Sequence, residues 1–242
     1  MKFSLISDMH VDFPQNKTPY DKLEKNVIVA GDTSNGLLGL KFLNKLRNKG
    51  FNVFAVDGNH EHYSNVSQNR DVYETIDKFR EIFPNETNMD GVRVAGCNGW
   101  YTVTGAMSWV SYQNDHANIF GKEPVSDAER VNYLAFQDYM HLKDLLDNSP
   151  DPLLIVTHTA PCEETLDPRF AGSFSNEWYF NPFMYRLLEK YSHKILAWCH
   201  GHTHARSQAI VHGVPVYCNP RGYPNENPEW EPLTIEIEIK EA

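Results

Sequence analysis

The chain has 242 residues, of which 41% are hydrophobic and 22% are charged. This composition is typical of an ordinary globular protein, and the length suffices for one domain with a sizeable core. The formal net charge of −10 argues against binding to extended nucleic acid or to an anionic membrane surface, because basic residues supply most of that affinity. A phosphate substrate held through metal ions is not excluded, since the charge of a metal offsets the carboxylates that bind it.

The first residues and the cysteines point to a cytoplasmic protein. The N-terminal stretch MKFSLISDMH has only a short apolar run, so it lacks the long apolar region and the cleavage site of a signal peptide. No apolar run approaches the roughly 20 residues that a membrane span needs. The cysteines are scattered and form no CxxC pair, which fits a reducing compartment; they are Cys97, Cys162, Cys199 and Cys218.

Short apolar runs alternate with helix-like stretches along most of the chain. Continuous rather than alternating apolarity predicts strands that are covered on both faces, as in an α/β protein. The stretch GLLGLKFLNKLRNKG has apolar residues at helical spacing and ends in glycine, which predicts a helix. In chain order we expect strands at 2–7, 26–31, 52–57, 92–97, 152–158 and 194–200, and helices at 36–49, 68–83, 127–147 and 180–191.

The C-terminal part has a different pattern. The stretch AIVHGVPVYC predicts a hairpin that turns through HGVP. The stretch LTIEIEIK (233–240) alternates strictly, which predicts a strand with one face in solvent. Residues 98–126 are rich in aromatic and polar residues without a clear period; we expect irregular surface there, although such segments often cover a site.

Aspartate, asparagine or histidine lies at or just after the C-terminal end of five of the predicted strands. Sites in open α/β sheets lie at the carboxyl ends of the strands, so we expect these five loops to converge on one crevice. Aspartate and asparagine also favour turns, which would explain one such coincidence but not five in series. The residues are Asp8 and His10, then Asp32, then Asn59, His60, Glu61 and His62, then His158, and finally His200, His202 and His204.

These residue types suit a site for two metal ions. Asp8 and His10 are two residues apart, so in an extended segment their side chains share a face and could hold one ion. Asp32 has two carboxylate oxygens and could bridge two cations. With the amide oxygen of Asn59 and the imidazole nitrogens, the mixed ligation suits Mn, Fe, Zn or Ni better than an all-oxygen Mg or Ca site. Two such ions, roughly 3.5–4 Å apart, can clamp a phosphate and activate a bridging water.

The chain resembles the calcineurin-like metallophosphoesterases in five short motifs that occur in the same order: SDMH (7–10), AGDT (30–33), GNHE (58–61), THTAP (157–161) and GHTH (201–204). Each motif alone is common, but the ordered series is specific. The resemblance covers 1–61 and 150–222 well and 62–150 loosely. We therefore expect residues 1–242 to form a single metallophosphoesterase domain, in which 62–150 is the variable substrate-side region. The segment NPRGYPNENPEW (219–230) resembles the end of the small prokaryotic and phage-type members.

The resemblance implies a four-layer α/β/β/α sandwich with two mixed β-sheets and a dinuclear metal centre at one edge. His60 would be the histidine that binds no metal and that stabilises the transition state or protonates the leaving oxygen. The expected cofactors are two divalent transition-metal ions (Mn, Fe, Zn or Ni, with Mn favoured). One ion would be held by Asp8, His10, Asp32 and His204, and the other by Asp32, Asn59, His158 and His202.

The expected function is hydrolysis of a phosphoester by attack of a metal-bridging hydroxide. The short chain shows no obvious large cap, which favours a phosphodiesterase acting on a nucleotide-type or other small phosphodiester. A phosphomonoesterase with the same ligands stays open. A non-catalytic metal-binding scaffold of the same fold ranks lower, because such a protein is expected to lose Asp32, Asn59 or His60, and all three are present. The oligomeric state stays open.

Two positions depart from the common family pattern. Thr159 stands where many members have a second histidine, and His62 stands where others have a hydrophobic residue. Arg221 could meet a substrate phosphate with two hydrogen bonds or form a structural salt bridge.

The remaining aromatic residues and histidines have more ordinary interpretations. Trp100, Tyr101, Trp109 and Tyr112 could stack on an aromatic leaving group, but core or lid packing is the commoner role. His200 is expected at a strand end, with its ring turned away from the metals. The other histidines are expected at the surface or against a metal ligand rather than a metal; they are His62, His116, His141, His193 and His212.

Overall fold

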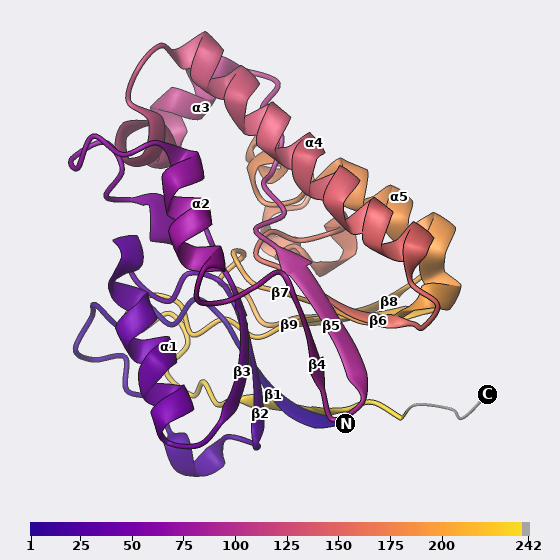
Figure 1. The fold of residues 1–242 in the computed structure, drawn as a ribbon. Helices are drawn as coiled ribbons and strands as arrows, with labels where there is room; N and C mark the ends of the chain where they lie inside the picture. Colours follow the sequence, from indigo (N-terminus) through magenta and orange to yellow (C-terminus); the bar gives the residue numbers. More distant parts are fainter. Residues whose placement is uncertain (239–242) are drawn as a thin grey trace.

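Two β-sheets lie face to face in the computed structural model, which describes residues 1–238, and helices cover the outer face of each sheet (Figure 1). The first sheet has the strand order β10-β1-β2-β3, in which β1, β2 and β3 are parallel and β10 is antiparallel to β1. Its strands are β1 (Lys2–Ile6), β2 (Asn26–Ala30), β3 (Asn52–Val56) and β10 (Leu233–Glu236).

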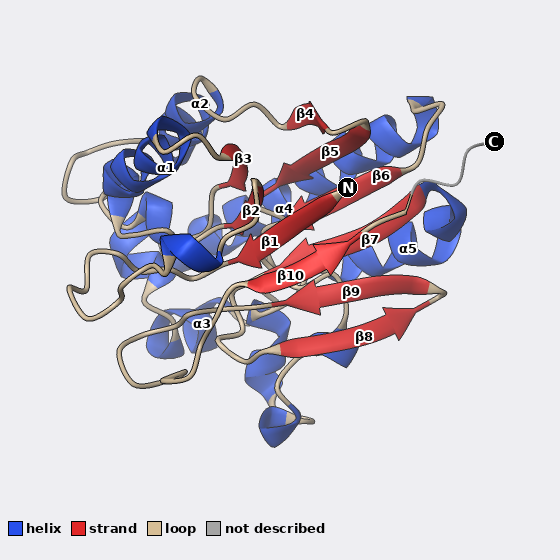
Figure 2. Cartoon of the chain, turned by 90° about the horizontal axis from the view of Figure 1, so that it is seen from below, coloured by secondary structure: helices blue, strands red, loops and turns tan. Residues whose placement is uncertain are grey.

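The second sheet has the order β4-β5-β6-β7-β9-β8. Its four central strands are parallel, and the two edge strands run antiparallel to their neighbours. Figure 2 shows the arrowheads of β1, β5 and β9 pointing to the same side of the molecule. The strands are β4 (Glu86–Met89), β5 (Val92–Cys97), β6 (Leu153–Thr157), β7 (Ile195–His200), β8 (Ser207–Val211) and β9 (Val214–Cys218).

Strands of the first sheet are apolar on both faces because each face packs against a different layer. In β2, Val27 and Val29 pack against α1 (Gly39–Asn48) and α2 (Val72–Arg80). The alternate residue Ile28 packs against the second sheet instead. The outer face of that second sheet is covered by α4 (Pro124–Asn148) and α5 (Pro182–Tyr191). The expected four-layer sandwich with two mixed sheets is therefore confirmed.

The strands and helices predicted from the sequence all form, with ends that shift by a few residues. The predicted strand 233–240 is observed as β10, and its residues 239–240 lie outside the described part of the chain. Among the strands and α-helices of residues 1–238, two were not predicted: the polar edge strand β4 and the helix α3 (Ala106–Tyr112). Both are short and lack a clear apolar period. Within residues 1–238, no helix combines the length and the apolar character that crossing a membrane requires.

The stretch 98–126 is more ordered than the expected irregular surface. It contains α3 and a π-helical turn, His116–Phe120. Trp100, Tyr101 and Trp109 are buried in an aromatic cluster that also includes Trp178, whereas Tyr112 is exposed. The aromatic residues thus mainly build a small core of their own beside the carboxyl ends of the strands.

Candidate metal centre

Loops from both sheets bring the predicted polar side chains together at the carboxyl edge of the sandwich. Parallel strands end at the same edge of a sheet, so residues far apart in the sequence become neighbours there. Asp8 and His10 follow β1, Asp32 follows β2, Asn59 and His60 follow β3, His158 follows β6, and His202 and His204 follow β7.

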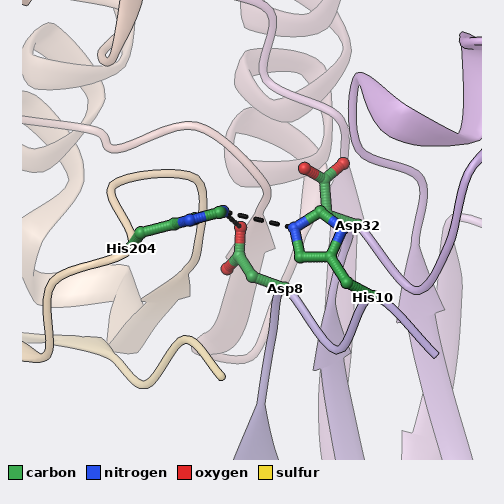
Figure 3. Close-up of side chains that lie close together, drawn as sticks. All are labelled: Asp8, His10, Asp32 and His204. Atoms are coloured by element: carbon green, nitrogen blue, oxygen red, sulfur yellow. Dashed lines mark hydrogen bonds and ion pairs between the residues drawn. The ribbon is translucent and has the colours of Figure 1, made fainter. Parts of the chain in front are cut away.

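A first cluster consists of Asp8, His10, Asp32 and His204 (Figure 3). Each residue offers one ligand atom, and these atoms all lie within 4.8 Å of one another. Nε2 of His10 lies 3.2 Å from Nε2 of His204, which in turn lies 3.4 Å from Oδ1 of Asp8. Asp8, His10 and Asp32 are buried, and His204 is partly exposed toward the cleft.

A second cluster shares Asp32 and adds His158 and His202, again with ligand atoms within 4.8 Å of one another. Nε2 of His158 is 3.2 Å from Nδ1 of His202 and 3.3 Å from Oδ1 of Asp32. The amide oxygen of Asn59 lies 3.0 Å from the same His158 nitrogen. Asp32 therefore stands between the two clusters, where a bridging carboxylate would have to be.

The donor set fits two divalent transition-metal ions. In each cluster two imidazole nitrogens face each other at 3.2 Å beside a carboxylate, so one cation that replaces the proton between them could bind both nitrogens and the carboxylate. Mixed nitrogen and oxygen donors suit Mn, Fe, Zn or Ni.

Hydrogen bonds to the outer nitrogens fix which imidazole nitrogen faces each cluster. Nδ1 of His158 is 2.9 Å from the Ala30 carbonyl oxygen. Nε2 of His202 is 3.0 Å from the Trp178 carbonyl oxygen. Nδ1 of His204 is 2.7 Å from a carboxylate oxygen of Glu226. In metal sites such contacts orient the ligating histidine and set its tautomer.

The backbone at the site is unusual. Positive φ is uncommon for residues other than glycine, yet φ is 50° at Asp8, 39° at His10, 52° at Asp32, 69° at His202 and 51° at His204. Such conformations concentrate at functional sites, where the surrounding structure holds them. At these residues the backbone leaves the extended conformation of the strands, and the ligand atoms of each cluster lie within 4.8 Å of one another.

Two glycines allow the loops to approach closely. A Cβ atom at Gly58 would collide with the Asp32 carboxylate, and one at Gly201 would collide with Asp8. The glycines in GNHE and GHTH are therefore required by the space that the carboxylates occupy.

The buried carboxylates make the site attractive to positive charge. Although burial opposes it, Asp32 raises the pKa of His158 to about 10. Burial also opposes the rise at His204, but hydrogen bonds to Asp8 and Glu226 raise that pKa to about 10. Burial lowers the pKa of His10 and of His202 to about 4, so these two imidazoles keep free lone pairs. Metal binding would displace the protons of His158 and His204.

His60 lies beside the first cluster, where its backbone N–H donates to Oδ1 of Asp32 at 2.8 Å and its ring centroid is 4.7 Å from that of His10. Its Nδ1 is 2.6 Å from Oδ1 of Asn35, and its Nε2 is 3.1 Å from the hydroxyl of Tyr223 and 3.8 Å from Asp32. The ring stacks on Tyr63, with centroids 3.9 Å apart. Neither Asn35 nor Tyr223 was singled out from the sequence, although Tyr223 lies in the segment 219–230 that resembles the end of the small family members.

Glu61 joins two of the loops. Its carboxylate accepts hydrogen bonds from the backbone N–H groups of Gly58 (2.7 Å), Asp32 (3.0 Å) and Thr33 (2.7 Å). Burial, together with the nearby Asp32 charge, raises the pKa of Glu61 to about 8. This carboxylate fixes the loop after β2 to the loop after β3.

The clusters open into a cleft of about 720 Å³. His60, His202 and His204 lie at its floor together with Asp32 and Asn59. Its walls carry aromatic, amide and arginine side chains, which are Tyr63, Tyr112, Gln113, Asn114, Arg169, Phe170, Tyr179, Arg206, Tyr223 and Asn227.

Arg221 is not placed with the other predicted site residues. Its guanidinium donates to the Asn227 carbonyl oxygen at 2.7 Å and lies over the Trp230 ring. It lines a separate hollow with Lys17 and Lys22. The structure therefore gives Arg221 a structural hydrogen bond and does not bring it to the cleft.

The remaining histidines also lie outside both clusters. His200 is buried at the end of β7, with Nδ1 2.9 Å from the Gly201 carbonyl oxygen and Nε2 2.8 Å from the Thr165 hydroxyl. His62 is buried against Trp100, and its Nε2 lies 2.9 Å from Asp57. Neither cluster contains any of the other four histidines, which are His116, His141, His193 and His212.

Comparison with known proteins identifies similar chains. A family model described as calcineurin-like phosphoesterase matches residues 1–206. The relative "Uncharacterized protein L509" of Acanthamoeba polyphaga mimivirus is 29% identical in an alignment 222 residues long, which covers 79% of this chain and 75% of the relative.

Two solved structures have a similar fold. The phosphopantetheinyl hydrolase PptH of Mycobacterium tuberculosis superposes with a TM-score of 0.69 at 17% identity, covering 93% of this chain and 90% of that chain. A dimetal phosphatase from Danio rerio has a TM-score of 0.53 at 17% identity, covering 90% and 86% respectively. At these identities the likeness shows the fold.

Proposed function

The chain belongs to the calcineurin-like phosphoesterase family and is a metal-dependent phosphoesterase, and from this premise we propose that it hydrolyses small phosphodiesters, with nucleotide-type diesters as the leading class. The observation that carries the proposal is the pair of ligand clusters sharing Asp32 at the floor of an open cleft. Shared carboxylates of this kind are typical of two-metal hydrolytic sites.

We assign one ligand set to each ion. The two ions, with Mn²⁺ favoured, would activate water and neutralise charge on the phosphate when bound. The first set is Asp8, His10, Asp32 and His204, and the second is Asp32, Asn59, His158 and His202.

His60 is assigned the proton transfer to the leaving oxygen. The Asn35 amide oxygen accepts a hydrogen bond, so it holds the proton of His60 on Nδ1 and leaves Nε2 to exchange a proton. Nε2 lies on the side of Tyr223, and both residues line the cleft. A positioned histidine of this type typically contributes about 10²–10⁴-fold to the rate.

The cleft favours a diester over a monoester. A volume of about 720 Å³ exceeds the need of a single phosphate and lies in the usual range for small-molecule sites. The cleft is lined by residues from 112–114 and from 167–170 in addition to the ligand loops, so we propose that it takes the two ester arms of a diester. The stretch 112–114 lies within 62–150, and we propose that this region shapes substrate choice in a single domain.

A phosphomonoesterase with the same ligands is the second candidate, and a non-catalytic scaffold is the third. The name of the mycobacterial structural neighbour adds phosphopantetheinyl esters to the substrates worth testing. We propose the cytoplasm as its location, because the four cysteines are free and buried. Extended nucleic acid and membranes are not proposed as partners, given the net charge of −10.

A substrate panel tests the proposal. The protein loaded with Mn²⁺ or Ni²⁺ is assayed on a bis-aryl phosphodiester, an aryl phosphomonoester, cyclic nucleotides, short oligonucleotides and a phosphopantetheinyl diester. The diesterase assignment predicts a higher kcat/KM on the small diesters than on the monoester. The reverse order would establish the phosphatase alternative, and no hydrolysis with any metal would favour the scaffold.

A further inference from the structure

The amide of Asn59 has two chemically different ends, and only one of them can bind a metal. Its oxygen has lone pairs for a cation, whereas its NH₂ group is a donor that would repel one. In the structure Oδ1 faces His158 at 3.0 Å, and Nδ2 donates to Oδ1 of Asp115 at 3.0 Å. The orientation of the amide is thus linked to a residue outside every motif of the family resemblance.

Asp115 is well suited to fix that orientation. It is 1% exposed, and its Oδ1 accepts the hydrogen bond from the Asn59 NH₂ group, which leaves the amide oxygen on the side of His158. Its carboxylate also accepts hydrogen bonds from the hydroxyls of Tyr63 (2.7 Å) and Tyr101 (2.5 Å). The NH₂ group of Asn59 and the two tyrosine hydroxyls are thus three donors that hold the carboxylate in place.

The tyrosines connect Asp115 to a second ligand and to the aromatic core. Trp109 donates its indole N–H to the Tyr101 hydroxyl at 3.0 Å. The Tyr101 ring lies nearly parallel to the His202 ring, with an interplanar angle of 14° and centroids 5.9 Å apart. Both Asn59 and His202, which belong to the second ligand set, therefore contact side chains of the stretch 98–126.

We propose that Asp115 is a positioning residue that turns the Asn59 amide oxygen toward the second metal position. The inference rests on the two-metal function proposed above. The proposal gives the stretch 98–126 a specific role, because the buried Asp115 carboxylate orients one ligand of the second ion, the Asn59 amide. Within residues 1–238 the Asp115 carboxylate forms hydrogen bonds with Asn59, Tyr63 and Tyr101 and with no ligand of the first set. Loss of Asp115 should therefore weaken the binding of the second ion and leave the binding of the first ion unchanged.

The test compares binding of Mn²⁺ alone to the full-length wild-type chain and to Asp115→Asn, which keeps the size of the side chain. An amide at 115 presents both a donor and an acceptor, so it no longer requires the NH₂ of Asn59 to face it. We expect the second Mn²⁺ to bind about 10–100-fold more weakly, as is typical when a partner of a metal ligand is lost. At a free Mn²⁺ concentration that fills both sites of the wild type but lies below the weakened dissociation constant, bound Mn²⁺ per chain should fall from two to one. The exchange-coupled EPR signal of a dinuclear site should then become that of isolated ions.

A reciprocal exchange distinguishes positioning from general damage. In the double variant Asn59→Asp/Asp115→Asn, the amide at 115 can donate to one carboxylate oxygen at 59 while the other oxygen faces His158. We expect this exchange to restore the second ion and the coupled EPR signal. Failure of the rescue, with both variants folded by circular dichroism, would overturn the positioning role.

Asp127→Asn is the matched control. Asp127 is also a buried carboxylate beside the same stretch, where it accepts a hydrogen bond from the Lys122 N–H at 2.9 Å, but it does not contact Asn59. This variant should keep two ions. Equal loss of the second ion in both variants, or an unchanged second ion in Asp115→Asn, would contradict the proposal. A wild-type chain that binds fewer than two ions would instead overturn the two-metal function itself.

Discussion

The hydroxyl oxygen of Tyr223 lies 3.1 Å from Nε2 of His60, and both side chains line the cleft. Asn35 holds the opposite nitrogen of the same ring at 2.6 Å, so the imidazole is fixed at both ends. Tyr223 comes from the loop after β9, far in the sequence from the GNHE motif. A C-terminal loop thus completes the surroundings of the proposed proton donor.

This geometry predicts different results for the two residues. His60→Ala should retain both ions and lower kcat about 10²-fold or more, because the proton donor is lost. Tyr223→Phe should have a smaller effect, about tenfold, because only a hydrogen bond to that donor is removed. Steady-state kinetics and metal content measure both. Tyr133→Phe is the control, since Tyr133 is an exposed tyrosine of α4. Unchanged kinetics in His60→Ala would remove its assigned role.

Asp32 should be needed for the binding of both metal ions, because it belongs to both ligand sets. Asp32→Asn replaces the shared carboxylate by a neutral amide, so we expect metal content to fall and turnover to become undetectable. The fold should be little changed, as judged by circular dichroism, because the side chain is similar in size. Full activity in this variant would be incompatible with a bridging role.

Glu61 should stabilise the fold as well as the site. Glu61→Ala would leave three buried N–H groups without their acceptor, at a cost of roughly 3 kcal/mol or more in the free energy of unfolding. Urea unfolding of the metal-free protein measures this. Glu189→Ala, at an exposed position of α5, should change the same quantity by less than about 0.5 kcal/mol. Equal stability of the two variants would show that water replaces the carboxylate.

Stability should depend on pH through Asp138, which is buried beside the aromatic core. Burial, together with the charge of Asp57, raises its pKa to about 7, against an ordinary value of 3.8. The folded protein therefore binds this proton more tightly than the unfolded chain does. The resulting stabilisation of the folded state is fully present below pH 3.8. It is lost as pH rises toward 7, at a cost of at most about 4 kcal/mol.

Asp138→Asn removes this titration while its amide oxygen can still accept from the Gly99 N–H. The free energy of unfolding of the variant, relative to wild type, should rise between pH 4 and pH 8. Urea unfolding across that range checks the sign. A relative stability that stays constant or falls would contradict the raised pKa.

The apolar pattern predicts an α/β protein and the meeting of the ligand side chains for one physical reason, whereas the four-layer sandwich is what the family resemblance implied. Continuous apolar runs mark strands covered on both faces, and parallel strands bring their carboxyl ends to one edge. His202 and His204 are therefore found beside Asp8 despite a separation of nearly the whole chain. His200 could be set apart from them because it still belongs to the strand.

Residues that act through loop geometry were not predictable in the same way. Asp115 and Tyr223 lie in segments without period, and their partners are known only once the chain has folded. Arg221 shows a related case: the sequence left open whether its guanidinium meets a phosphate or forms a structural interaction, and in the structure it donates to the Asn227 carbonyl oxygen. Side-chain direction in a loop depends on such local contacts, which composition does not specify.

The central claim is that two metal ions at these clusters hydrolyse a phosphodiester. The most direct test titrates chelator-treated protein with Mn²⁺ while hydrolysis of a bis-aryl phosphodiester is followed. The metal-free protein should be inactive, and activity should rise to a plateau at two equivalents per chain. Activity that survives chelation, or that reaches its maximum at one equivalent, would contradict the two-metal mechanism.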